Sequence, residues 1–115
     1  MTDHHALGAM FASKFVEVAR AQPEYWRAVD PAIRRLQNPR HSYRGRDDTE
    51  IGNATLSRIA VATGHSTWGQ LEKFITGEEP RRYWGVEVWE IADGFLSRFH
   101  YAARIAAPPS PRHVY

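Results

Sequence analysis

Apolar residues recur every three or four positions along most of this 115-residue chain. The first such run contains, at spacings of four, four and three, Leu7, Phe11, Phe15 and Val18. This periodicity places them on one face of an amphipathic helix. No segment shows the alternation of apolar and polar residues that is typical of a strand. The sequence therefore predicts an all-α fold, a small helical domain of about five helices.

Proline and glycine divide this pattern into segments, because the residue before a proline avoids helical geometry and glycine often follows a helix. Asp30 and Pro31 suit an N-cap and a first helical position, so a break between two short helices is expected there. Asn53 is expected to cap a later helix, and Asp93 with Gly94 to break or kink the last one. The predicted helical segments are 3–22, 24–29, 32–37, 53–62, 67–76 and 82–106, and residues 38–52 are predicted to form a polar loop with room for one weak turn of helix.

The length suits one domain, predicted over residues 1–106 and followed by a proline-rich tail over 107–115. The 43% hydrophobic content is typical of a folded protein. The absence of cysteine excludes disulfides and thiolate metal sites. Apolar runs are far shorter than the roughly 20 residues that cross a bilayer, and residues 1–5 lack the features of a secretory signal. A cytoplasmic protein that does not enter the membrane is therefore expected.

No catalytic or metal-binding motif stands out. The sequence lacks a glycine-rich phosphate loop, a nucleophile elbow and paired catalytic carboxylates, and its six histidines lack metal-ligand spacing. The acidic cluster of Asp47, Asp48 and Glu50 is too small for a hard-cation site, which needs about six oxygen ligands. Helix capping and pairing with Arg44 and Arg46 are the expected roles of these acids. The sequence therefore predicts no enzyme, no cofactor and no metal site.

Two predicted helices, 53–62 and 67–76, are joined by the short glycine-containing turn 63–66. Such a pair is typical of a helix-turn-helix core. Ala60 is small, so the second helix can pack close to the first. In helix-turn-helix proteins the second helix presents polar and basic side chains to the major groove of DNA. The residues of the second helix that fit this role are Thr67, Gln70 and Lys73.

Two stretches carry a family resemblance: Ala-Thr-Leu-Ser-Arg-Ile at 54–59 and Thr-Trp-Gly-Gln-Leu-Glu-Lys-Phe at 67–74. Together they resemble the Cro/CI-type (xenobiotic-response-element) helix-turn-helix proteins, without a gap over about 20 residues. Members of that family are mostly transcriptional repressors, many from phages, and often dimerise on palindromic operators. The resemblance therefore implies binding to duplex DNA. The chain departs from the family at 42–49, which has almost no apolar face, and at 60–62, where Ala-Val-Ala replaces glutamate, a polar residue and glycine.

Two assignments of the DNA-reading helix stay open. The resemblance implies that 53–59 enters the groove. In that assignment the residues facing bases and phosphates are Asn53, Thr55, Ser57 and Arg58. The turn and the core pattern instead make 53–62 the supporting helix and 67–76 the reading helix. His65, in the turn, fits either a phosphate contact or a plain solvent-exposed role.

The net charge is only +2, but the basic residues are unevenly placed. Between residues 27 and 46, six arginines face a single acid, Asp30. Arginine suits bidentate contacts to phosphate, so this stretch is expected to follow the DNA backbone. The arginines nearest the predicted motif are Arg40, Arg44 and Arg46. An ordinary solvated face is the alternative interpretation.

These features predict a sequence-specific transcriptional regulator of helix-turn-helix type, repressor-like, that binds duplex DNA. The alternative is a small helical protein-interaction module, an inhibitor or adaptor, that acts through its aromatic C-terminal helix. The segment 84–106 favours this alternative because Trp89, Leu96 and Ala103 broaden its apolar arc. The same segment, which begins at Trp84, could pair with a second copy to form a homodimer.

Overall fold

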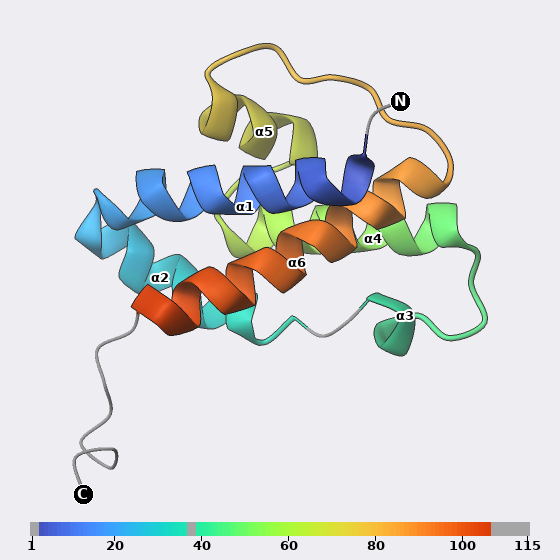
Figure 1. Ribbon diagram of the computed structural model, residues 1–115, viewed down its shortest axis with the longest axis horizontal. Helices are drawn as coiled ribbons and strands as arrows, with labels where there is room; N and C mark the ends of the chain where they lie inside the picture. The colour runs from blue at the N-terminus through green and yellow to red at the C-terminus, as the bar shows by residue number, and fades with distance from the viewer. Residues whose placement is uncertain (1–2, 37–38, 107–115) are drawn as a thin grey trace, which may run out of the picture.

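A computed structural model describes residues 3–36 and 39–106 of the chain. Throughout these two ranges the regular secondary structure is helical, which confirms the all-α prediction (Figure 1). The predicted tail, 107–115, lies outside the described residues. The helices are α1 (His4–Arg20), α2 (Pro23–Arg34), α3 (Pro39–Ser42), α4 (Asp48–Ala62), α5 (Trp68–Thr76) and α6 (Val86–Ala106).

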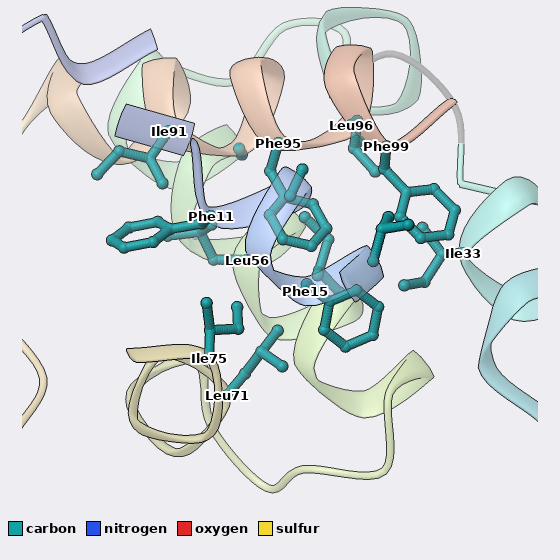
Figure 2. Close-up of a cluster of buried hydrophobic side chains, with 14 of the residues drawn as sticks. Phe11, Phe15, Ile33, Leu56, Leu71, Ile75, Ile91, Phe95, Leu96 and Phe99 are labelled. Carbon is teal, nitrogen blue, oxygen red and sulfur yellow. The ribbon is translucent and has the colours of Figure 1, made fainter. Parts of the chain in front are cut away.

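The first and last helices, α1 and α6, lie side by side along the molecule, with α5 on one flank and α2 and α3 on the other (Figure 1). Helix α4 packs against α6 and carries α5 at its far end. Apolar side chains from five of the helices meet between them (Figure 2). The largest fully buried ones include Phe15, Ile33, Ile59, Leu71, Ile91, Phe95 and Phe99.

Three glycines allow these helices to touch through their backbones. A Cβ atom on Gly8 of α1 would overlap the carbonyl oxygen of Ile91 in α6. A Cβ atom on Gly94 of α6 would likewise overlap the carbonyl oxygen of His5. Gly52 of α4 lies in the same way against the α6 backbone at residues 88 and 89. The expected break at Asp93 and Gly94 is therefore wrong: Gly94 serves a close helix crossing inside a continuous α6.

The expected break at Asp30 and Pro31 is also wrong, since α2 runs through both residues. Val29 and Ile33 lie one turn apart on the same face of α2, and both are buried in the core. Burying two such side chains contributes roughly 1.5–3 kcal/mol each, enough to offset the roughly 3 kcal/mol cost of an internal proline. The Asp30 carboxylate accepts a hydrogen bond from Arg34 Nε at 2.9 Å instead of capping a new helix.

Helix α4 begins five residues earlier than predicted, inside the segment expected to be a loop. Asp47 is its N-cap, because the Asp47 carboxylate accepts a hydrogen bond from the backbone N–H of Glu50 at 2.9 Å. This confirms the capping role expected for the acidic cluster, but Asn53 is an exposed residue within the helix and not its cap. Burial of Ile51 and Gly52 against α6 explains the extension, because these residues belong to the helical core face.

The caps of α5 agree with the sequence. The Thr67 hydroxyl accepts a hydrogen bond from the Gln70 N–H at 3.2 Å, and Gly77 ends the helix with φ of 75°. Helix α6 starts at Val86, later than predicted, and residues 81–84 before it are not helical. Trp84, the first residue of the apolar segment 84–106, lies before α6 and is 70% exposed. In the described part of the chain, no helix combines the length and the apolar character needed to cross a membrane.

Replacing Gly94 with alanine tests the backbone contact between α1 and α6. The added methyl group must push the two helices apart, so the free energy of unfolding should fall by about 1–3 kcal/mol. Thermal and urea unfolding followed by circular dichroism measure this change. Gly69→Ala is the matched control, since its Cβ would lie 3.3 Å from the Pro80 ring and no backbone blocks it. An equal effect of the two variants would contradict the close crossing.

Candidate nucleic-acid interface

The turn between α4 and α5 is closed by hydrogen bonds of its own backbone and side chains. Thr63 is fully buried, and its hydroxyl donates to the carbonyl oxygens of Ala60 at 2.8 Å and Ile59 at 3.1 Å. Gly64 follows with φ of 80°, a conformation that favours glycine. The His65 N–H then returns to the Ala60 carbonyl at 2.9 Å. The two helices and the short glycine-containing turn expected from the sequence are therefore present.

Tyr25 of α2 anchors this turn from outside. The Tyr25 hydroxyl donates to the Thr63 carbonyl at 2.8 Å and lies 3.2 Å from His65 Nε2. The His65 ring also packs on Phe74 of α5, with ring centroids 5.1 Å apart. Burial lowers the pKa of His65 and raises the pKa of Tyr25, the latter partly offset by the hydrogen bond to Thr63. His65 is thus a half-buried structural residue of the turn.

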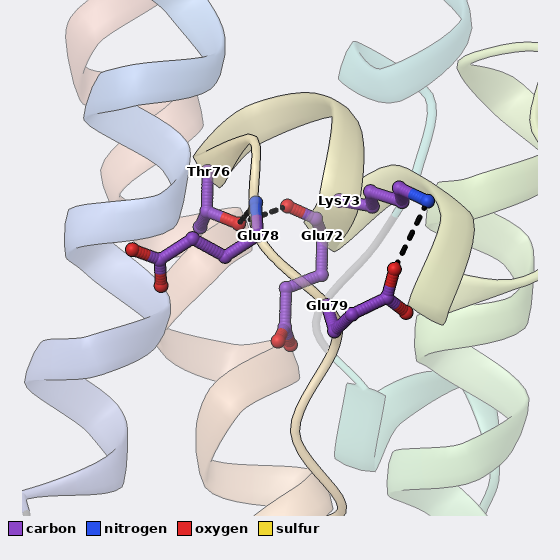
Figure 3. Close-up of polar contacts among 5 residues, drawn as sticks. All are labelled: Glu72, Lys73, Thr76, Glu78 and Glu79. Atoms are coloured by element: carbon purple, nitrogen blue, oxygen red, sulfur yellow. Dashed lines mark hydrogen bonds and ion pairs between the residues drawn. The ribbon is translucent and has the colours of Figure 1, made fainter.

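A buried carboxylate on the inner face of α5, together with apolar contacts, holds this helix in the fold. Glu72 is only 3% exposed and accepts hydrogen bonds from Trp68 Nε1 at 3.2 Å and the Arg81 N–H at 2.8 Å. Figure 3 shows Glu72 turned away from Lys73 and Glu79, which meet outside the helix. Burial and the nearby negative charge of Glu72 raise the pKa of Tyr83, whose hydroxyl is buried beside the same segment. These contacts fasten the residues after α5 to the helix itself.

The outer face of α5 carries the predicted polar residues. Thr67, Gln70 and Lys73 are all exposed and follow one another at three-residue spacing. Lys73 Nζ pairs with Glu79 at 3.1 Å (Figure 3), and both side chains are largely exposed, so this ion pair contributes little stability. The Gln70 side chain accepts a hydrogen bond from the Ser66 N–H at 3.1 Å. The first turn of α5 contains no acidic residue.

The outer face of α4 differs from the expectation at one position. Asn53, Ser57 and Arg58 are exposed, as the resemblance implied. Thr55 is 3% exposed, so it faces the interior and cannot reach a base. Thr55 lies one helical turn from both Ile51 and Ile59, so it belongs to the buried face of α4.

Two of the predicted arginines, Arg46 and Arg58, contact Tyr43, which was not among the predicted site residues, and a third, Arg44, follows it in the chain. Arg58 Nη1 donates to the Tyr43 hydroxyl at 3.2 Å, and the Arg58 guanidinium lies 5.8 Å from the centre of the Tyr43 ring. The Arg46 guanidinium lies 5.9 Å from the same ring centre. Arg44 is exposed in the intervening turn. We call Tyr43, Arg44, Arg46 and Arg58 the Tyr43 cluster; its one sequence signal is a lone aromatic residue within a polar stretch.

Arg40 has a different setting from the other arginines. Its guanidinium lies 4.2 Å from the centre of the Trp89 ring in α6. It also forms an ion pair with Asp48 of α4 at 3.2 Å. The acidic cluster therefore pairs with Arg40, while the expected pairing with Arg44 and Arg46 is not found among the described residues. Arg40 holds the short α3 against α4 and α6.

Most of the broad apolar arc of α6 is buried against other helices of the fold. Leu96 is 3% exposed, and the main stripe from Val88 to Phe99 is buried against α1 and α4. Ala103 lies beyond the side chains that the structure describes. The large apolar side chains that stay exposed near or on α6 are Trp84, Val86 and Tyr101. Within residues 3–36 and 39–106, no three His, Asp or Glu side chains come together in a way that could hold a metal ion.

Fold and site together define an all-α protein that contains a pair of helices, α4 and α5, joined by an anchored, glycine-containing turn. No protein-family model, curated protein or solved structure matches the chain. Membership of the Cro/CI-type proteins therefore stays a prediction from the residues at 54–59 and 67–74.

The lowered pKa of His65 predicts an acid-sensitive contribution to stability. Below its ordinary value of 6.5 the unfolded chain binds this proton more tightly than the folded chain, so folding is destabilised as the pH falls. Well above pH 6.5 both states are neutral at His65, and the contribution no longer changes with pH. Urea unfolding of wild type and His65→Gln between pH 7.5 and 5 measures the difference, and the variant should lose less stability on acidification. Parallel curves for the two proteins would contradict the burial of this ring.

Proposed function

We propose that the protein binds duplex DNA through α5 and acts as a transcriptional regulator of helix-turn-helix type. The observation that carries the proposal is the exposed polar face of α5, Thr67, Gln70 and Lys73, on a helix whose preceding turn is anchored by Tyr25. Helix-turn-helix proteins read bases with residues near the N-terminus of the second helix. A fixed turn presents those residues without an additional ordering cost.

Three features favour α5 over α4 as the reading helix. The first turn of α4 carries Asp48 and Glu50, which repel the phosphates that flank a groove. The helix before α4, α3, has four residues and is too short to support it as a recognition helix. The side chain of Gln70 in α5 can bind adenine through two hydrogen bonds, and Lys73 can bind guanine.

The proposal includes a repressor-like role in the cytoplasm and a homodimer, because two-fold operators pair with two-fold proteins. Its dimer contact would use the exposed apolar residues Trp84, Val86 and Tyr101.

A protein-interaction module is the second candidate function. Trp84, 70% exposed, favours it because tryptophan is common at the energetic centres of protein interfaces.

Substitutions on the two helices distinguish these functions and the two reading helices. A binding site is first selected from random duplexes with the wild-type protein, and fluorescence anisotropy then compares that site with a scrambled one. Gln70→Ala and Lys73→Ala should each reduce the preference for the selected site by about ten-fold, the loss of one base contact. Asn53→Ala and Ser57→Ala, on the exposed face of α4, are the matched controls and should leave the preference unchanged.

The opposite pattern, with loss of preference in the α4 variants alone, would assign reading to α4. The absence of salt-dependent binding to any duplex would overturn the proposed function in favour of the interaction module. Circular dichroism of each variant shows whether the Gln70 substitution also loosens the N-terminus of α5, where Gln70 bonds the Ser66 N–H.

A further inference from the structure

The Tyr43 cluster is built on a tight turn that directs two arginines outward. The Arg46 N–H returns to the Tyr43 carbonyl at 3.2 Å, and Gly45 adopts a φ of 83°. Positive φ is costly for other residues, so the glycine allows this turn to close. Arg44 and Arg46 are both exposed on its outer side. The closed turn thus sets where the two side chains leave the backbone.

The Tyr43 side chain brings a third arginine from α4 into the same place. Its hydroxyl accepts a hydrogen bond from Arg58, and its ring lies within about 6 Å of the guanidinium groups of both Arg58 and Arg46. Residues 43 and 58 belong to different elements, so the cluster forms only in the folded chain. One aromatic side chain therefore orients two cations, next to a third in the turn.

Two of the carboxylates near the cluster are used elsewhere. Asp47 caps α4, and Asp48 pairs with Arg40. Among the residues that the structure describes, no ion pair is found for Arg44, Arg46 or Arg58. Gathering like charges costs free energy, and a partner that carries several negative charges offsets that cost.

We propose that the Tyr43 cluster binds the phosphodiester backbone of nucleic acid, with one arginine to each of up to three phosphates. Guanidinium groups bind phosphate through paired hydrogen bonds, and a backbone supplies phosphates at regular intervals. A lipid surface fits less well, because surface binding uses inserted apolar side chains as well as charge. The described residues of 39–58 include no large exposed apolar side chain. The proposal rests on the proposed function only for the choice of duplex DNA as the partner.

The salt dependence of duplex binding tests this assignment, because log K falls with log salt and each phosphate contact adds about 0.9 to the magnitude of that negative slope. The triple variant Arg44→Ala/Arg46→Ala/Arg58→Ala should therefore lower this magnitude by about 2.7, and each single variant by about 0.9. Arg98→Ala removes an exposed arginine of α6 that donates to the Ser13 hydroxyl of α1, outside the stretch 27–46, and is the matched control, with no change expected. Tyr43→Leu keeps all three charges but removes the ring, and it should weaken binding several-fold.

Anisotropy titrations of a fluorescent duplex across a salt series give these slopes, and thermal unfolding shows that each variant is folded. A wild-type slope in the triple variant would overturn the proposal. The proposal would also be overturned if the triple variant lost binding to phosphatidylserine vesicles but kept its binding to duplex DNA. The two proposals can fail separately. A reduced salt dependence in the triple variant would support the backbone contact. If Gln70→Ala and Lys73→Ala at the same time left the site preference unchanged, sequence reading by α5 would be rejected.

Discussion

Gly8, Gly52 and Gly94 bring the backbones of α1 and α4 into direct contact with that of α6. At this distance a methyl group has no room, so each glycine is needed even though glycine weakens a helix by roughly 0.5–1 kcal/mol. Through these close crossings α1 and α4 cover α6 on two sides and bury its apolar arc. They also set which face of α4 is left for solvent, and hence where Arg58 can meet Tyr43.

Two tyrosines then connect this core to the candidate interface. Tyr25 fixes the turn before α5 through the Thr63 carbonyl and His65. Tyr43 fixes Arg58 beside the turn that carries Arg44 and Arg46. Each uses an aromatic ring for packing and a hydroxyl for a directional bond. The two tyrosines thus position the surface that we assign to nucleic acid, and neither has to contact the nucleic acid itself.

Local signals in the sequence predicted the helices better than their ends. Periodicity alone indicated α1, α5 and most of α6, and the caps at Thr67 and Gly77 lie where the residue types placed them. Pro31, Asn53 and Gly94 misled because burial of neighbouring side chains outweighs a local break or cap signal. The exposed site residues could be chosen from polarity, whereas polarity misplaced Thr55, which lies one turn before the buried Ile59 and shares its face. The link between Tyr25 and His65 joins residues 40 positions apart and leaves no local pattern.

The contact between α1 and α6 joins the two ends of the described chain: His5 lies 3.0 Å from Asp93, 88 residues later. A ribosome therefore releases α1 long before the helix against which α1 packs. Until α6 emerges, the apolar face of α1, with Phe11 and Phe15, can be covered only in part, by α2 and α5. Folding of this domain must follow the synthesis of nearly all of it. A truncation before α6 would yield an aggregation-prone fragment and not a smaller working domain.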